Sequence, residues 1–170
     1  MGVEIERKFL LTSDAWRAAV VRSERMSQGY LIDAAALRAG GVRCSVRVRI
    51  AGDGAWLNIK SAVHGIERRE YDYPIPLADA ERQLAEFCDA RLEKTRHYVP
   101  CGDYTFEIDE FHGDNAGLVV AELELPAVDA PFERPAWLGA EVSDRPRYYN
   151  IHLINHPFAR WSAAEKSGAV

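Results

Sequence analysis

Apolar and polar residues alternate over most of this chain, and this alternation predicts β-strands that each bury one face. Within residues 42–50, the apolar side is formed by Cys44, Val46, Val48 and Ile50, and these alternate with Arg43, Ser45, Arg47 and Arg49. Strands are expected on this basis at residues 3–10, 42–50, 55–60, 68–75, 91–99, 104–111 and 118–125. Asp-Gly pairs of the kind found at residues 53–54 are typical of hairpin turns. The pattern therefore predicts a strand-rich, antiparallel domain.

Helical spacing of apolar residues occurs in only a few short segments. Helices are expected over about residues 13–22 and about residues 79–88. A short third helix over about residues 148–154 should end before Pro157, because the residue ahead of a proline disfavours helix. Together with the strands, these segments predict an α+β fold.

Nearly every expected strand carries a column of charged residues, because residues two apart share one face. Most columns contain charges of one sign: Glu4 and Glu6, Arg47 and Arg49, Glu70 and Asp72, Lys94 and Arg96, Glu107 and Asp109, Glu122 and Glu124. On any single strand, a solvated outer face explains such a column. For all the strands together, a solvated outer face is a weaker explanation. Adjacent like charges repel one another, and the surfaces of soluble proteins usually mix positive and negative charges. One shared face of this kind can hold a divalent metal on its carboxylates and a polyanion on its cations.

Composition narrows the class of protein. The 170 residues are 48% hydrophobic and 28% charged, which suits one folded domain. A formal net charge of -5 argues against binding to nucleic acid or an anionic membrane by bulk charge. The charged first residues do not resemble a signal peptide, and the three cysteines contain no C-x-x-C pair. A cytoplasmic location is therefore expected.

A series of short motifs runs along almost the whole chain. It starts with E-x-E-x-K at Glu4-Ile5-Glu6-Arg7-Lys8. It continues with Gln28-Gly29-Tyr30-Leu31, Arg47-Val48-Arg49, Leu57-Asn58-Ile59-Lys60, Glu70-Tyr71-Asp72-Tyr73-Pro74, Glu93-Lys94-Thr95-Arg96, Phe106-Glu107-Ile108-Asp109, Glu122-Leu123-Glu124 and Asp144-Arg145-Pro146-Arg147-Tyr148. In this order the motifs resemble those of the CYTH, or triphosphate tunnel metalloenzyme, superfamily. The chain departs from the usual pattern at Asp72, where glutamate is common, and at Tyr149, where lysine is common.

The resemblance implies a fold and a set of site residues. The fold would be a closed antiparallel eight-stranded β-barrel over residues 1–170, with charged columns facing a tunnel, helices packed outside and a peripheral tail after about residue 160. Mg²⁺ or Mn²⁺ would be held by Glu4, Glu6, Glu70, Asp72, Glu107, Asp109, Glu122 and Glu124. Substrate phosphates would be bound by Lys8, Arg47, Arg49, Lys94, Arg96 and Arg147. Lys60 and Tyr30 would be the catalytic residues that activate water or protonate the leaving group.

The implied activity is metal-dependent hydrolysis of inorganic triphosphate to pyrophosphate and phosphate. The same resemblance leaves thiamine triphosphatase and class IV adenylate cyclase open, and a non-catalytic module that binds polyphosphate or RNA ends is an alternative of another class. Eight carboxylates argue against a pure anion binder. The expected partner is a small-molecule triphosphate, without nucleic acid or membrane, and a homodimer is left open. The crowded carboxylates are expected to repel one another, so that neutralising Glu122 should not destabilise the metal-free protein.

Overall fold

The computed structural model describes residues 2–61 and 67–166; residues 1, 62–66 and 167–170 of the expected domain lie outside the described residues. Its strands are β1 (Gly2–Leu11), β2 (Arg22–Ile32), β3 (Cys44–Ala51), β4 (Gly54–Ser61), β5 (Glu67–Pro74), β6 (Leu92–Cys101), β7 (Tyr104–Phe111), β8 (Val119–Glu124) and β9 (Leu138–Glu141). Its α-helices are α1 (Ala34–Arg38), α2 (Leu77–Glu86), α3 (Asn150–Leu153) and α4 (Ala163–Lys166). Short 3-10 turns are η1 (Ala15–Ala19), η2 (Gly113–Asn115), η3 (Pro146–Tyr148) and η4 (Phe158–Arg160).

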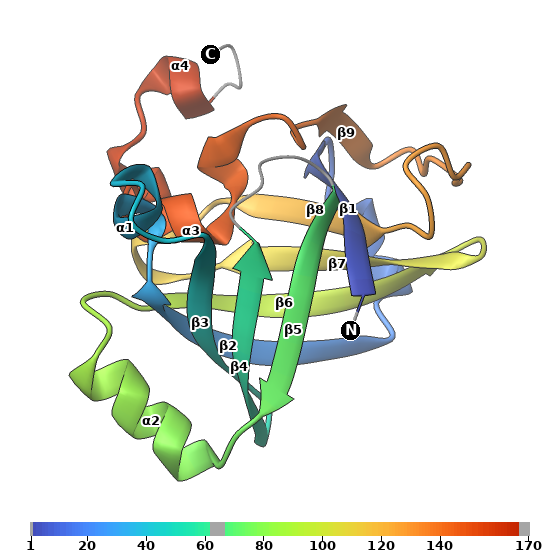
Figure 1. The fold of residues 1–170 in the computed structure, drawn as a ribbon. Helices are drawn as coiled ribbons and strands as arrows, with labels where there is room; N and C mark the ends of the chain where they lie inside the picture. Colours follow the sequence, from blue (N-terminus) through green and yellow to red (C-terminus); the bar gives the residue numbers. More distant parts are fainter. Residues whose placement is uncertain (1, 62–66, 167–170) are drawn as a thin grey trace.

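The described strands form one antiparallel sheet in the order β5-β4-β3-β2-β6-β7-β8-β1-β9 (Figure 1). The sheet curls strongly, and the long strand β1 changes partner along its length. Residues 2–5 of β1 pair with β5, whereas residues 6–9 pair with β8. The expected closed eight-stranded barrel is wrong: the sheet has nine strands, and β9 extends it beyond β1.

Two strands were not expected from the sequence. In β2, polar residues such as Ser27 and Gln28 stand next to each other, so both faces are polar and the alternation is lost. β9 has only four residues, too few for a periodic signal. The helix expected over residues 13–22 is wrong in length, because only the short turn η1 forms there before β2 begins.

The expected helix over residues 79–88 is confirmed as α2, with both ends shifted by two residues. Ala80 and Leu84 are buried on its inner face. Gly29 of β2 permits this packing, because a Cβ there would lie 2.7 Å from the Cys88 Sγ. At the third expected position, η3 and α3 form and end before Pro157. Among the helices in the described part of the chain, none has the length and apolar character needed to cross a membrane.

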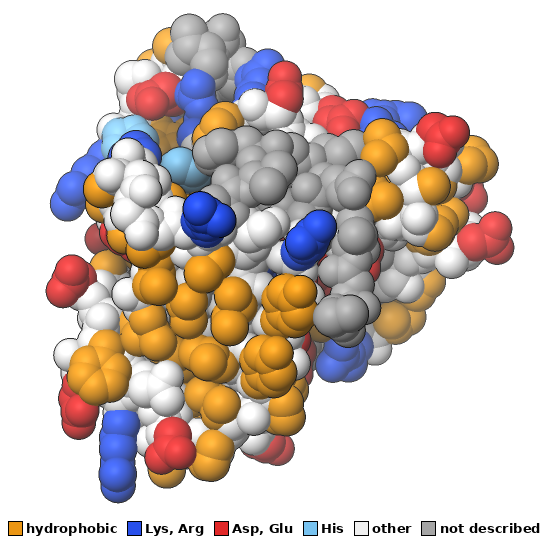
Figure 2. Space-filling view, in the orientation of Figure 1, with side chains coloured by type: hydrophobic (Ala, Val, Ile, Leu, Met, Phe, Trp, Pro, Cys, Tyr) orange, Lys and Arg blue, Asp and Glu red, His pale blue; other side chains and the backbone are white. Residues whose placement is uncertain are grey.

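The apolar columns point away from the charged ones and build the core on the outer side of the sheet. Val48 of β3 and Ala55 of β4 form one buried cluster with Ala80 and Leu84 of α2. Hydrophobic side chains gather over β3, β4, β5 and α2 on the face shown in Figure 2. The inner side of the sheet is thereby left to the charged residues.

A second buried cluster fixes the C-terminal segment against β6–β8. Tyr148, Leu153 and Trp161 pack there with Phe111 and Val142. Trp161 belongs to the tail that was expected to be peripheral, yet it is 4% exposed and its ring centroid lies 5.1 Å from that of Tyr148. This packing holds η3 and α3 beside the inner side of the sheet.

Candidate active site

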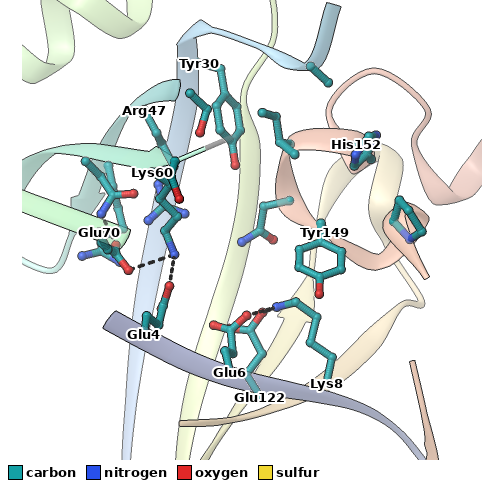
Figure 3. Close-up of a pocket in the computed structure, with 18 of the residues that line it drawn as sticks. Glu4, Glu6, Lys8, Tyr30, Arg47, Lys60, Glu70, Glu122, Tyr149 and His152 are labelled. Carbon is teal, nitrogen blue, oxygen red and sulfur yellow. Dashed lines mark hydrogen bonds and ion pairs between the residues drawn. The ribbon is translucent and has the colours of Figure 1, made fainter. Parts of the chain in front are cut away.

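The inner side of the curled sheet encloses a cavity of about 670 Å³ (Figure 3). Every strand from β1 to β8 contributes at least one side chain, and α1 and α3 line it as well. Most of the predicted site residues reach this cavity: Glu4, Glu6, Lys8, Tyr30, Arg47, Arg49, Lys60, Glu70, Lys94, Arg96, Glu107, Glu122 and Glu124. The charged columns of separate strands therefore meet in one space.

Two predicted metal ligands, Asp72 and Asp109, are not among the residues that line the cavity. Asp72 accepts a hydrogen bond from the Arg49 Nη2 at 2.9 Å. Asp109 is 0% exposed and pairs with Lys94 and with Arg96, whose Nη2 lies 2.7 Å from the Asp109 Oδ2. Both carboxylates thus support cationic side chains of the cavity.

Arg147, predicted to bind phosphate, also lies outside the cavity wall. Its guanidinium lies 5.7 Å from the Trp161 ring centroid, and its Nη1 is 4.0 Å from the Glu165 Oε1. It therefore faces the C-terminal segment, and its assignment to the substrate stays a prediction. No periodic pattern covers this irregular segment, so the sequence could not show the direction of the side chain.

The deepest part of the site is a network of buried ion pairs. Lys8 contacts both Glu122 and Glu6, with 2.5 Å between the Lys8 Nζ and the Glu6 Oε1. The Arg96 Nη2 lies 2.5 Å from the other oxygen of Glu122. Burial raises the pKa of the Glu122 carboxyl, but Lys8, Arg96 and Lys94 outweigh it and hold this pKa well below the usual range. The expectation that Glu122 is strained is therefore wrong, because its charge is compensated.

Lys60 bridges two carboxylates nearer the entrance. Its Nζ lies 2.8 Å from the Glu4 Oε2 and 3.0 Å from the Glu70 Oε2 (Figure 3). Burial raises the pKa of Glu4 to about 7; Lys60 opposes this shift, whereas Glu6 and Glu70 add to it. The pKa of the neighbouring Glu70 carboxyl is instead lowered to about 2, because Lys60 and hydrogen bonds from Glu4 and Asn58 outweigh its burial.

Two cationic side chains, Arg49 of β3 and Lys94 of β6, have lowered pKa values. Burial and the charge of Arg47 lower the pKa of the Arg49 guanidinium. Burial and the charge of Arg96 lower the pKa of Lys94 to about 8. Burial is the larger cause of both shifts and a neighbouring cation the next, so an anion placed beside these two groups would stabilise their charged forms.

The cavity carboxylates supply the oxygen donors that Mg²⁺ and Mn²⁺ prefer. Within residues 2–61 and 67–166, no group of three or more Asp, Glu, His or Cys side chains is arranged to hold a metal ion. The reason is visible at Glu4 and Glu70, whose oxygens both point at the Lys60 ammonium. Burial is the main cause of the raised pKa of Glu4, and a cation beside this carboxylate would favour its charged form. The donor chemistry therefore fits a divalent cation at Glu4, Glu6 and Glu70.

Several residues that line the cavity were not among the site residues predicted from the sequence. Asn58 stands two residues before Lys60 in the same column, so the alternation of β4 could have identified it. Tyr149 precedes α3 and His152 lies within it, and the helical pattern expected over residues 148–154 did not indicate that either faces a cavity. The Tyr149 hydroxyl donates to the Ser143 carbonyl at 2.6 Å, and its ring centroid lies 4.9 Å from the Lys8 Nζ.

The raised pKa of Glu4 predicts how stability depends on pH in the metal-free protein. Between pH 4.5 and about 7 the folded protein keeps a proton that the unfolded chain has lost, so the free energy of unfolding falls as pH rises. Relative to Glu4→Gln, which cannot ionise, the wild type should lose about 3 kcal/mol from pH 4 to 8. Chemical denaturation at each pH, with a chelator present to keep the protein metal-free, measures this difference. Glu86→Gln, at an exposed position of α2, is the control, and its free energy of unfolding should change with pH as that of the wild type does. If the difference in unfolding free energy between the wild type and Glu4→Gln did not change with pH, the prediction would be contradicted.

Comparisons with known proteins agree with this arrangement. The model of the CYTH domain family matches residues 2–152. A protein of Acetivibrio thermocellus named inorganic triphosphatase is 39% identical over 159 residues, which are 93% of this chain and 97% of the relative. A Nitrosomonas europaea protein of the same name is 32% identical over 154 residues, 88% of this chain and 95% of the relative.

The fold of this chain is also similar to that of a solved inorganic triphosphatase structure. The crystal structure of an inorganic triphosphatase superposes with a TM-score of 0.65 at 30% identity, covering 91% of this chain and 95% of the other. The resemblance that the ordered motifs suggested is thereby confirmed over nearly the full length. With its charged columns gathered around one cavity, this chain belongs to the CYTH family.

Proposed function

We propose that this protein is a divalent-metal-dependent triphosphatase that hydrolyses inorganic triphosphate to pyrophosphate and phosphate. Two relatives that it matches over nearly their whole length carry the name inorganic triphosphatase. The observation that carries the proposal is that carboxylates and cationic side chains from separate strands of the sheet line one cavity. Burial and, after it, neighbouring cations lower the pKa of Arg49 and Lys94, whereas burial and neighbouring carboxylates raise the pKa of Glu4. A bound polyanion would stabilise the charged forms of Arg49 and Lys94, and a metal cation bound with it would stabilise the charged form of Glu4.

Each group of residues has a part in this proposal. The phosphates bind to the cationic side chains Lys8, Arg47, Arg49, Lys94 and Arg96, whose arginine forks match phosphate oxygens. Glu4, Glu6 and Glu70 would hold Mg²⁺ or Mn²⁺, with Glu107, Glu122 and Glu124 as further predicted ligands. When bound, such a metal neutralises phosphate charge and lowers the pKa of a coordinated water.

Lys60 and Tyr30 are the proposed catalytic residues. The Lys60 ammonium contacts the carboxylates of Glu4 and Glu70 and lines the same cavity as the proposed phosphate ligands. A proton held at its Nζ can be given to the leaving phosphate as charge develops there. Tyr30 lines the cavity nearby (Figure 3) and can orient water or the leaving oxygen through its hydroxyl. The cytoplasmic location, the absence of nucleic-acid and membrane binding, and the homodimer stay predictions from the sequence.

Substrate comparison tests the proposal. Phosphate release should be fastest from tripolyphosphate, and much slower from ATP and thiamine triphosphate, with Mg²⁺ or Mn²⁺ present. A chelator should abolish it. Cyclic AMP as the main product from ATP, or thiamine triphosphate as the fastest substrate, would replace the proposed activity by another. Binding of tripolyphosphate without any turnover in all metal conditions would indicate a binding module.

A further inference from the structure

Arg47 differs from the other cationic side chains of the cavity. Its residue is 6% exposed, and its one hydrogen bond within the described residues runs from its Nη1 to the Gln28 Oε1, at 3.4 Å. Its Nε has no hydrogen-bond partner there. Carboxylate partners are found instead for Lys8, Arg49, Lys60, Lys94 and Arg96.

Two neutral amides, Asn58 of β4 and Gln28 of β2, lie on the strands that flank Arg47. Asn58 stands directly opposite Arg47 on β4 and donates its Nδ2 hydrogens to Glu70 and to Asp72, the latter at 3.2 Å. These two carboxylates are thereby engaged on the far side of Asn58. On the other flank, β2 presents the fully buried Gln28, which is 0% exposed.

A neutral acceptor and a carboxylate at this position would have different consequences. A carboxylate would orient the guanidinium and also cancel its charge, whereas an amide oxygen orients it and leaves the charge in place. The lowered pKa of Arg49, to which the charge of Arg47 contributes, agrees with a positive field that is not cancelled. In a buried site such a charge is costly until an anion arrives.

We infer that Gln28 is a positioning residue, which holds Arg47 through a neutral amide oxygen so that its full positive charge remains available to an anionic substrate. The inference rests on the proposed function for the identity of that substrate as a condensed phosphate. Gln28 would act through Arg47 and need not itself touch the phosphates.

Gln28→Glu tests this directly, because it changes the charge of the acceptor at nearly constant shape. Binding of tripolyphosphate to the chelator-treated protein, measured by calorimetry, should weaken by about tenfold to a hundredfold, the range expected when one charge-assisted contact to phosphate is lost. The melting temperature should equal or exceed that of the wild type, because the new carboxylate compensates Arg47. A merely structural glutamine would show the reverse, with a lower melting temperature and unchanged binding.

Gln83→Glu on α2 is the matched control, since it makes the same change of charge on a helix that does not line the cavity. It should bind tripolyphosphate like the wild type. If Gln28→Glu fails to fold, Gln28→Leu decides: weakened binding supports the inference, and binding equal to that of the wild type overturns it.

The inference and the proposed function can fail separately. Equal binding by the wild type and Gln28→Glu overturns the role of Gln28, whatever the activity. A wild type that binds tripolyphosphate more tightly than Gln28→Glu, but hydrolyses none of it with Mg²⁺ or Mn²⁺, supports the role of Gln28 and overturns the hydrolytic function.

Discussion

Replacing Glu122 with glutamine is expected to lower the free energy of unfolding by about 3–5 kcal/mol, the usual cost of breaking a buried ion pair from one side. Glu122 is 4% exposed and contacts Lys8 and Arg96, so its neutralisation leaves two buried cations short of a partner. Hydrolysis should also collapse, because both cations are proposed phosphate ligands. Chemical denaturation and phosphate release from tripolyphosphate measure the two effects.

Glu93→Gln provides the control for stability. Glu93 also pairs with an arginine, Arg25, but both side chains are about half exposed, at 47% and 58%. Its loss should cost less than about 1 kcal/mol, as is usual for surface ion pairs. If Glu122→Gln proved as stable as Glu93→Gln, the buried ion pairs would not stabilise the fold. The expectation from the sequence, that the carboxylates of the metal-free protein repel one another, would then be supported.

Lys60→Ala is expected to reduce kcat for tripolyphosphate by about a hundredfold to a thousandfold, the range typical of general acid catalysis, with a smaller change in KM. The reason is the position of the Lys60 Nζ between Glu4 and Glu70, where it can hold a proton for the leaving phosphate. Steady-state kinetics at saturating Mg²⁺ separate the two constants.

Lys60→Arg distinguishes a proton donor from a simple charge. Arginine keeps the positive charge but does not release a proton near neutral pH. It should therefore remain almost as slow as Lys60→Ala. Recovery of kcat in Lys60→Arg, or a rise in KM with kcat unchanged, would assign Lys60 to phosphate binding.

Much of the site could be predicted from the alternation of residues alone. Side chains two apart share a face in any strand, so the column of Glu4, Glu6 and Lys8 was predictable without knowing the neighbours of β1. The ordered motifs then implied that the charged columns face inward, and the cavity contains most of the predicted residues. The apolar columns likewise predicted which side of β3 and β4 packs under α2.

The number of strands and their pairing could not be predicted from the sequence, because both depend on contacts between residues far apart in the chain. β2 carries polar residues on both faces because its inner side meets the cavity, and it is held by hydrogen bonds to β3 and β6 more than by its own pattern. β9 is too short to carry a signal and exists because β1 offers it an edge. An expected closed eight-stranded barrel thus became one curled sheet of nine strands.

The sequence by itself determined which residues are charged, which face of each strand they occupy and the family to which they belong, because these follow from local spacing and order. Only the tertiary structure decided the partners. It placed Glu122 between Lys8 and Arg96, turned Arg147 toward Glu165, and left Arg47 with the amide of Gln28. Coulomb energy and desolvation depend on distance and burial, and residues far apart in the chain acquire both only when the sheet curls.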